Sequence, residues 1–336
     1  MILITGGAGY IGSHTVLNFI THGIKDIIIF DNLETGHLET IKELRKLADI
    51  KFEKGDLRNL DDIRQVFEKY PIEAVIHFAA FSLVGESVVE PSKYYRNNTF
   101  GTLNLLDAMV EFNSRHIVFS STCATYGEPE YLPIDEKHPQ NPINPYGTSK
   151  LMVERIMKDY DDAYGVKSNK LRYINVAGCD TLARIGEWHD KETHVIPCIL
   201  KSALSEDGRV FNIYGDDYET SDGTCIRDYV NVEDLAEAHR LAYLYLRQEN
   251  ISDVFNIGTE KGDSVKRVFE ICEKVVGNNI PVEISERRIG DPAKLYANAD
   301  KIRATMGWKP ERDLVDSISA AYEWEKKLST IIKKGV

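Results

Sequence analysis

The sequence predicts an α/β protein with a doubly wound parallel sheet and a smaller C-terminal α/β lobe. Short apolar segments alternate with longer amphipathic ones up to residue 176, a glycine-rich turn follows the first apolar segment, and the pattern changes from residue 177. Repeated strand–helix units are typical of parallel sheets with helices on both faces. We therefore expect a first domain at 1–176 and a second lobe at 177–336, with some later segments returning to the first domain.

Each expected element rests on its own local pattern. Strands are expected at 1–5, 26–30, 50–55, 73–78, 116–121 and 169–176, and most of these segments are rich in Ile and Val and apolar on both faces. Amphipathic periodicity predicts the helices between them at 11–22, 60–70, 91–113 and 146–164. In the second half, loops rich in Gly, Asp and Pro separate helices near 232–248, 264–276 and 313–328.

Composition excludes several classes of protein. The 336 residues are 43% hydrophobic, which allows one large core and a smaller lobe, and there is no apolar run long enough to suggest a membrane helix. The five cysteines form no Cys-x-x-Cys motif, so we expect neither a disulfide framework nor a zinc ribbon, and we expect a cytoplasmic location. A net charge of −12 disfavours nucleic acid as a partner.

The glycine-rich turn "ITGGAGYIGSH" (4–14) indicates a dinucleotide site. Gly7, Gly9 and Gly12 match G-x-G-x-x-G, while Gly6, Gly9 and Gly12 match G-x-x-G-x-x-G. Such glycines allow a tight turn and let the backbone approach a pyrophosphate at the helix N-terminus, so the fold is expected to be Rossmann-type.

Two acidic residues extend this reading. Asp31 ends the second strand, at the spacing from Gly12 where a carboxylate would bind the adenosine ribose hydroxyls and repel a 2′-phosphate. The expected cofactor is therefore NAD rather than NADP. Asp56 could reach the adenine or could cap a helix, and its position alone favours neither.

The segment "PYGTSK" (145–150) places Tyr146 and Lys150 on one face of a predicted helix. Spacing alone proves little, because Tyr322 and Lys326 repeat it in a charged C-terminal segment. The context of Tyr146 differs, since it follows the nucleotide loop and a strand that ends in Ser120, Ser121 and Thr122.

This context suits a tyrosine base. Lowering a tyrosine pKa from about 10 towards 7 takes about 4 kcal/mol, which one cation at about 4 Å supplies at an effective dielectric near 20. Lys150 and a nicotinamide cation could supply it, and Thr122 could hold the reacting hydroxyl for general base catalysis coupled to hydride transfer.

Further motifs carry a family resemblance. "TGGAGYIGSH", "GDLRN", "NNTFGT", "NPYGTSKLMVE", "LRYINVAG", "GDDYETSDGTCIRDYVNVEDLAEAH", "RRIGDPAKL" and "GWKP" lie in order along the chain. The sequence resembles the extended short-chain dehydrogenase/reductases, and most closely the UDP-glucose 4-epimerase family, over nearly its whole length.

The resemblance implies an NAD-dependent isomerase that inverts C4 of a UDP-hexose through a transient 4-keto sugar. Tyr146, Lys150 and Thr122 would be catalytic. NAD-binding residues would be Gly6, Gly7, Gly9, Tyr10, Ile11, Gly12, Asp31, Asn32, Asp56, Leu57, Phe78, Ala79, Ala80, Asn98, Ser120, Tyr146 and Lys150. UDP-sugar-binding residues would be Thr122, Tyr146, Asn175, His194, Val195, Tyr214, Arg227, Tyr229, Val265, Arg288, Asp291 and Leu295.

The sequence departs from the family at three positions. Ser82 stands where some relatives have a lysine that contacts NAD, and Ile174 replaces a common aromatic residue. Leu295 occupies the position that gates the sugar pocket, where an aromatic side chain would exclude N-acetylated sugars and a small one would admit them. UDP-glucose and UDP-galactose are the main expectation, with UDP-N-acetylhexosamines and UDP-pentoses left open.

Rival activities lack their residues. Sister dehydratases place Asp-Glu directly after the Thr, and decarboxylases place a Glu there, whereas this chain has Cys123 and Ala124. Cys123 would be either an acid/base thiol or, as we favour, a small packed residue. A non-catalytic NAD-binding protein would be expected to lose Tyr146 or Lys150.

Two further expectations concern partners. "HDKETH" (189–194) has histidines near acids, which we interpret as loop charge or substrate-loop structure, so no metal is expected. The family resemblance also implies a homodimer formed by a four-helix bundle of the segments 91–113 and 146–164.

Overall fold

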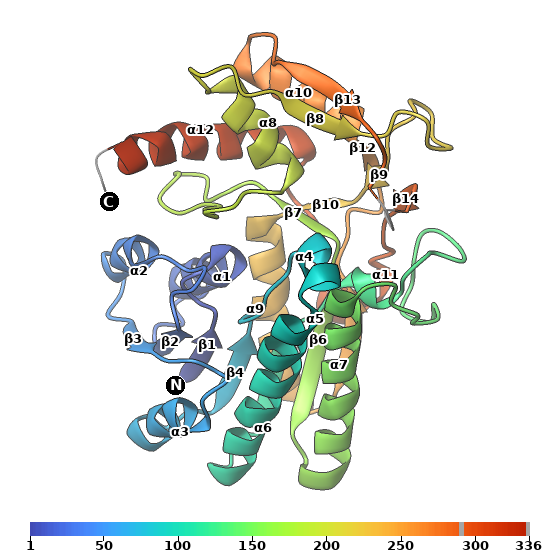
Figure 1. Cartoon of the computed structure of the whole chain (residues 1–336). Helices are drawn as coiled ribbons and strands as arrows, with labels where there is room; N and C mark the ends of the chain where they lie inside the picture. Colours follow the sequence, from blue (N-terminus) through green and yellow to red (C-terminus); the bar gives the residue numbers. More distant parts are fainter. Residues whose placement is uncertain (289–291, 334–336) are drawn as a thin grey trace.

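The structure is a computed structural model that describes residues 1–288 and 292–333 (Figure 1). A seven-stranded sheet with the order β11-β6-β5-β4-β1-β2-β3 forms its lower part, and the neighbouring strands run parallel. The strands are β1 (Ile2–Thr5), β2 (Ile27–Asp31), β3 (Lys51–Lys54), β4 (Ala74–His77), β5 (His116–Ser120), β6 (Lys167–Arg172) and β11 (Asp253–Asn256). The predicted doubly wound parallel sheet is confirmed.

Alternating side chains of the strands face two helical layers. Ile2 and Ile4 pack in one core with the first layer, while Leu3 packs in the other core with the second. The first layer contains α1 (Tyr10–Thr21), α2 (Leu38–Arg45) and α9 (Val232–Glu249). The second contains α3 (Leu60–Lys69), α6 (Gly101–Glu111) and α7 (Pro145–Tyr164). The central strands are apolar on both sides because both faces of the sheet are covered.

The strand order reverses between β1 and β4, which lie side by side. The connection after β1 runs to one helical layer, and the connection after β4 runs to the other. Such a divergence opens a crevice at the carboxyl ends of the two strands. Ligands of open α/β sheets bind at such a switch point. The fold therefore places the glycine loop after β1 and the segment after β4 at the expected cofactor site.

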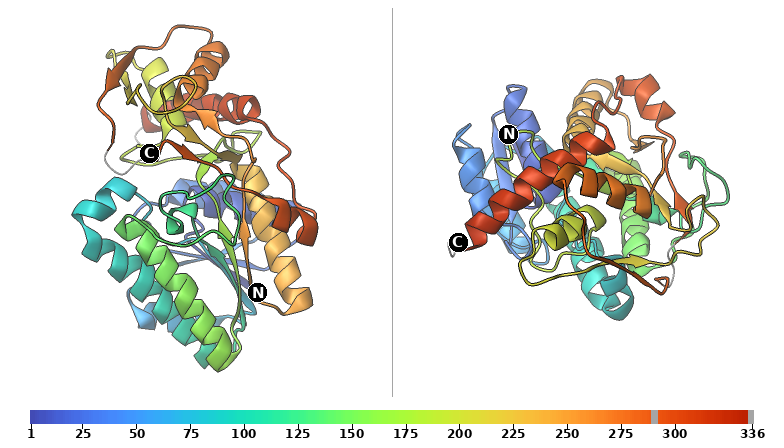
Figure 2. Two further views of the ribbon diagram at one scale, coloured as in Figure 1. Left: turned by 90° about the vertical axis from the view of Figure 1, so that its right-hand side faces the viewer. Right: turned by 90° about the horizontal axis from the view of Figure 1, so that it is seen from above.

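A smaller lobe lies above the carboxyl edge of the sheet (Figures 1 and 2). Its core joins α8 (Val195–Ala203), α10 (Val265–Val276) and α12 (Leu314–Lys333) to the parallel pair β8 (Phe211–Tyr214) and β13 (Val282–Ser285). Short strands line its lower side: β7 (Asn175–Ala177) with β10 (Tyr229–Asn231), and β9 (Ile226–Arg227) with β12 (Asp263–Ser264) and β14 (Lys294–Leu295).

The predicted strand 169–176 is wrong as a single element. β6 ends at Arg172, and β7 begins at Asn175 in a different sheet. The Cys123 amide donates a hydrogen bond of 2.9 Å to the Tyr173 carbonyl, which extends the contact with the segment after β5, and the chain then enters the lobe through β7. Continuous apolar character could not reveal this change of sheet.

The predicted helix 91–113 is also interrupted. It consists of α5 (Pro91–Tyr94), a π-helical turn (Tyr95–Phe100) and α6. Single π turns are frequent at functional sites, and this one carries Asn98. The short helices α4 (Val84–Val89) and α11 (Asp300–Met306) and the 3₁₀ turn Cys123–Thr125 complete the described elements.

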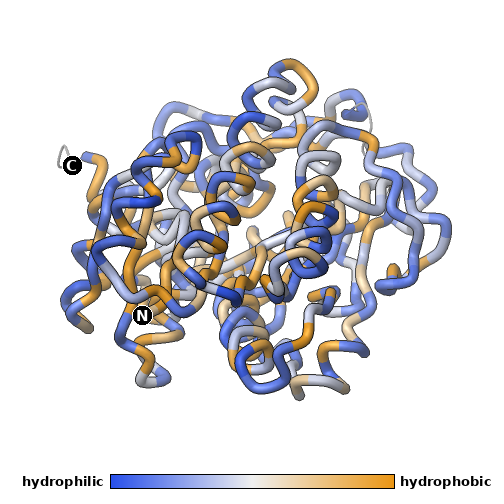
Figure 3. Tube along the Cα trace, turned by 90° about the horizontal axis from the view of Figure 1, so that it is seen from below, coloured by the Kyte–Doolittle hydropathy of each residue, from blue (hydrophilic) through white to orange (hydrophobic). Residues whose placement is uncertain are grey.

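Figure 3 shows hydrophobic and hydrophilic residues alternating along the helices that cover the sheet, as amphipathic helices require. Among the described residues, none of the helices is both long and apolar enough to span a bilayer.

Candidate active site

The glycine loop forms a tightly packed backbone cradle between β1 and α1. Gly6 has a φ of +72°, and a Cβ there would lie 2.6 Å from the Ala79 amide nitrogen. A Cβ on Gly12 would lie 2.2 Å from the Gly6 carbonyl oxygen. Both positions therefore require glycine, and the exposed backbone amides at the start of α1 suit a pyrophosphate.

Replacing Gly12 with Ala should destabilise the fold by about 3 kcal/mol, because the new methyl group meets backbone that cannot move aside. The variant should also lose bound NAD. Thermal unfolding and the dinucleotide content of the purified protein measure the two effects.

Gly85 in α4 is the matched control for this substitution. A Cβ there meets nothing within 4 Å, so Gly85→Ala should change stability by less than about 1 kcal/mol. Similar behaviour of the two variants would contradict the cradle.

The two predicted acids differ in their surroundings. The Asp31 carboxylate is 7% exposed and accepts hydrogen bonds from the amides of Ala8 (3.0 Å) and Leu33 (2.8 Å), so it is fixed directly beside the glycine loop. Asp56 instead pairs with Arg58, whose hydrogen bonds lower the Asp56 pKa to about 2. The Asp56 carboxylate also accepts a hydrogen bond of 3.0 Å from the Asn32 side-chain amide. These two predicted cofactor residues are therefore neighbours, and Asn32 directly follows Asp31.

The other predicted cofactor residues lie on three nearby segments. Phe78, Ala79 and Ala80 follow β4, and Ser120 ends β5. The Asn98 side chain is 2% exposed and exchanges hydrogen bonds with the Phe81 backbone, so the π turn is tied to the segment after β4. Leu57 is buried below that turn, against Gly101 at the start of α6.

The side chains of two predicted cofactor residues make contacts inside the protein. The Tyr10 hydroxyl donates a hydrogen bond of 2.6 Å to the Gly178 carbonyl of the upper lobe. The Ile11 side chain packs against the core beneath α1. Because both side chains are engaged in these contacts, we still expect only the backbone of Tyr10 and Ile11 to contact NAD.

The structure brings Tyr146, Thr122 and Lys150 together at the end of β5. Asn144 caps α7 by accepting from the Gly147 amide, and Pro145 starts the helix, so its first turns present Tyr146 and Lys150. Burial raises the Tyr146 pKa to about 12, while a hydrogen bond with Thr122 acts in the opposite direction. Tyr322 and Lys326 lie instead on α12, where the lysine covers the tyrosine ring at 4.6 Å.

The Lys150 amine is almost fully buried beneath the site. It donates a hydrogen bond of 2.8 Å to the Ser120 carbonyl oxygen and lies 4.7 Å from the centre of the Phe119 ring. Burial lowers the pKa of this amine to about 7, although the charge of Glu154 acts to raise it. The Lys150 amine is therefore held on the backbone of β5, and Lys150 lies one turn of α7 before Glu154.

A buried ion pair supports this arrangement from behind. The Arg172 guanidinium at the end of β6 pairs with the Glu154 carboxylate, and both side chains are 6% exposed. Glu154 also accepts a hydrogen bond of 2.5 Å from the Ser121 hydroxyl, next to Thr122. Arg172 additionally donates to the Tyr126 hydroxyl at 2.8 Å. Sequence reasoning missed this pair because its partners lie on different elements, a helix and a strand, and only the packing brings them together.

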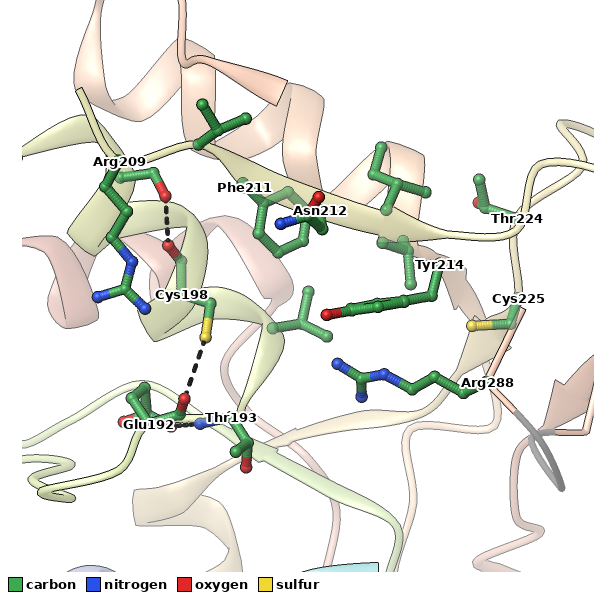
Figure 4. Close-up of a pocket in the computed structure, with 15 residues that line it drawn as sticks. Glu192, Thr193, Cys198, Arg209, Phe211, Asn212, Tyr214, Thr224, Cys225 and Arg288 are labelled. Carbon is green, nitrogen blue, oxygen red and sulfur yellow. Dashed lines mark hydrogen bonds between the residues drawn. The ribbon is translucent and has the colours of Figure 1, made fainter. Parts of the chain in front are cut away.

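A second part of the site is a pocket of about 240 Å³ in the upper lobe (Figure 4). Four predicted substrate residues line it: Val195, Tyr214, Val265 and Arg288. The Arg288 guanidinium lies 4.0 Å from the centre of the Tyr214 ring, so a cation and an aromatic face stand together. Such a pocket suits an anionic ligand that contains flat rings.

Sequence reasoning missed several residues of this pocket. Arg209 stands at the opposite end from Arg288 in Figure 4 and adds a second guanidinium group, and Phe211 adds a second aromatic ring. Phe211 begins β8, and Arg209 lies just before that strand. In the sequence, only a basic residue near an apolar segment marked this position. The missed residues also include Glu192, Cys198, Asn212, Thr224 and Cys225.

The remaining predicted substrate residues lie on the short strands of the lobe and at the start of α8. Asn175 and Tyr229 are partners in the β7–β10 pair, and the Tyr229 side chain is buried. Arg227 on β9 is 7% exposed and pairs in register with Leu295 on β14. His194 stands at the N-cap position of α8, directly before Val195. Asp291 lies outside the described residues.

Comparisons with known proteins agree with this geometry. Residues 3–320 match the family model described as GDP-mannose 4,6 dehydratase. The UDP-glucose 4-epimerase of Lactobacillus helveticus is 49% identical over 97% of this chain and 97% of its own. That of Halalkalibacterium halodurans is 48% identical over 97% and 96%. A crystal structure of UDP-glucose 4-epimerase from Brucella ovis in complex with NAD is 43% identical, with a TM-score of 0.90 over 96% of this chain and 98% of that one.

The chain belongs to the UDP-glucose 4-epimerase family. It also falls within the wider family that the dehydratase model describes. This epimerase-family chain lacks the acids that a dehydratase would need after Thr122, because Cys123 and Ala124 follow it.

One small cluster collects two of the three positions at which this epimerase-family chain departs from its relatives, while Ser82 lies outside it. Ile174 and Leu295 both pack against the buried group formed by Cys123, Tyr126, Ile134 and Ala297. Burial raises the pKa of the Cys123 thiol far above its usual range, which disfavours an acid/base role and supports the packing interpretation. The expected gate residue therefore packs in the cluster that contains Cys123, the direct neighbour of Thr122.

Proposed function

We propose that the protein binds NAD and interconverts UDP-glucose and UDP-galactose by inverting C4 of the sugar. The observation that carries the proposal is the placement of Tyr146 and Thr122. The same protein has a glycine cradle with no room for a side chain at Gly6 or Gly12 and a pocket that offers Arg288 and Tyr214, and both features support the proposal. The cradle and the buried Asp31 carboxylate fit the pyrophosphate and the ribose hydroxyls of NAD.

The residues divide the chemistry between them. NAD supplies the acceptor and donor of the C4 hydride when it is bound. Tyr146 removes the proton from the sugar 4-hydroxyl and returns it to the other epimer, while Thr122 holds that hydroxyl. Arg288 and Arg209 bind the diphosphate, so the sugar can turn over while the nucleotide stays anchored.

The electrostatics explain why the tyrosine needs the cofactor. With a pKa of about 12, Tyr146 keeps its proton near neutral pH. A positive charge close to the phenol lowers this pKa because it favours the phenolate. The nicotinamide cation and a protonated Lys150 are the two candidate sources of that charge, so catalysis begins only in the NAD-bound protein.

The direct test uses purified protein with no added NAD. UDP-galactose is incubated with it, and the products are separated by chromatography. Equilibration with UDP-glucose supports C4 epimerisation with retained cofactor. Absence of conversion, when NAD is shown to be bound, would contradict the proposal.

Leu295 tests the breadth of the substrate range. Replacing it with Tyr should reduce activity on UDP-N-acetylgalactosamine by at least about tenfold, because one misfitting group in a pocket costs about 1–3 kcal/mol. Activity on UDP-galactose should change far less. The ratio of kcat/KM for the two substrates is the measurement, and an unchanged ratio would show that Leu295 does not gate the sugar.

We also propose a cytoplasmic homodimer. Its support is the expected bundle of α6 and α7, which pack together and leave Phe100 50% and Met152 43% exposed at or near their surfaces. All five cysteines are free, as a reducing compartment requires. Sedimentation of the purified protein tests the dimer, and replacing Met152 with Glu should shift it towards monomer.

A further inference from the structure

Four potential metal ligands meet in the segment between β7 and α8. They are Glu187, His189, Glu192 and His194, and one ligand atom from each lies within 4.8 Å of all the others. The two carboxylate side chains are 5% and 3% exposed, whereas the imidazoles of His189 and His194 are 27% and 45% exposed. Buried oxygens under partly exposed imidazoles leave a path by which an ion can enter.

The distances suit a tetrahedral ion. His189 Nδ1 lies 3.5 Å from Glu187 Oε1 and 3.4 Å from Glu192 Oε2, and His194 Nδ1 lies 3.8 Å from Glu192 Oε1. Ligands about 2.1 Å from a tetrahedral ion stand about 3.4 Å apart, which is close to these values. His194 and Glu187 instead share a direct hydrogen bond, so these two side chains must move apart to admit an ion between them.

A second observation points to a missing cation. The buried Glu192 Oε2 atom has no hydrogen-bond partner among the described residues. Its nearest charged neighbours are His189 Nδ1 at 3.4 Å and Lys201 Nζ at 3.6 Å. The carboxyl group of Glu325 on α12 is also buried, with Oε1 unpartnered among those residues. Lys201 and His189 compensate part of this buried negative charge, and a bound cation would also give Glu192 Oε2 the ligand contact that it lacks.

We propose that Glu187, His189, Glu192 and His194 bind one Zn²⁺ ion. Two imidazoles and two carboxylates in a tetrahedral set suit Zn²⁺, whereas Mg²⁺ and Ca²⁺ prefer six or more oxygen ligands. Tyr146 belongs neither to this cluster nor to the lining of the pocket that Glu192 borders, so we assign the ion a structural role and no part in the hydride chemistry. The motif "HDKETH" contains three of these residues and was interpreted as loop charge or substrate-loop structure, whereas Glu187 lies outside it and joins them only in the fold.

The position of the segment gives the ion its role. Trp188 stacks on His37 of the first domain with ring centres 3.8 Å apart, and Trp324 of α12 donates a hydrogen bond to the Glu187 carbonyl. Glu192 and Val195 line the substrate pocket. An ion held here fixes one segment against the cofactor domain, α12 and the pocket at once.

The test uses the full-length, tag-free protein after treatment with a chelator. Zn²⁺ is titrated in competition with a fluorescent indicator, and the metal retained after gel filtration is measured by mass spectrometry. One equivalent per chain and a higher melting temperature are expected. Mg²⁺ should produce neither effect. This readout is independent of epimerase activity, so it can fail while the proposed function stands.

Three variants locate the ion. His189→Asn and Glu192→Gln should each weaken Zn²⁺ binding by about 100-fold, because even groups that only support a ligand contribute about 10–100-fold. His22→Asn is the matched control, since His22 faces Glu237 at 4.0 Å at the end of α1, away from the cluster. Failure of the native protein to bind Zn²⁺, or unchanged binding by both cluster variants, overturns the proposal.

Discussion

Replacing Tyr146 with Phe should lower kcat about 10³-fold, within the range that general acid–base groups contribute, and should leave NAD bound. The ring still packs against Tyr94, whose centre is 6.5 Å away, so the site keeps its shape and loses only the group that moves the proton. The rate of UDP-galactose conversion and the NAD content of the purified variant provide the two readings.

The chain offers its own control for this experiment. Tyr322 has the same spacing to a lysine but lies on α12, so Tyr322→Phe should keep nearly full activity. If Tyr146→Phe retains more than a tenth of the native kcat, Tyr146 is not the base.

Replacing Arg172 with Met should destabilise the protein by about 3–5 kcal/mol, because it leaves a buried, unpaired carboxylate. Burial acts to raise the pKa of Glu154, but the hydrogen bonds and charge of Arg172 more than offset this effect and lower it. Without Arg172, the carboxylate must be buried as a lone charge or take up a proton. Urea unfolding at neutral pH measures the loss.

The double variant separates loss of the pair from loss of packing. Changing Glu154 to Leu together with Arg172 to Met removes both charges and should recover most of the lost stability. A double variant as unstable as the single one would show that the guanidinium contributes through Tyr126 rather than through Glu154.

Local features of the sequence predicted the centre of the site. The glycine spacing, the acid at Asp31 and the Tyr146–Lys150 pair each depend on residues close in sequence, and the backbone geometry follows from that spacing. The same holds for the central strands, whose apolar faces identify them without knowledge of their neighbours.

Features that depend on contacts between distant segments could not be predicted. The break between β6 and β7 accompanies a change of partner, because β6 pairs with β5 and β11 whereas β7 pairs with β10, a strand that comes much later in the chain. Arg209 lines the pocket together with residues of α8, α10 and the segment before β9, which are far apart in the sequence. The hydrogen bond that holds the Lys150 amine on the Ser120 carbonyl oxygen was likewise not evident from the sequence.

The most direct test of the account follows the hydrogen at C4. UDP-galactose carrying deuterium at C4 is converted in ordinary water, and the position of the label in UDP-glucose is determined by NMR. Because hydride is expected to leave and return within one closed site, the product should keep the deuterium at C4. Replacement of that label by solvent hydrogen would contradict a mechanism in which Tyr146 moves only the hydroxyl proton.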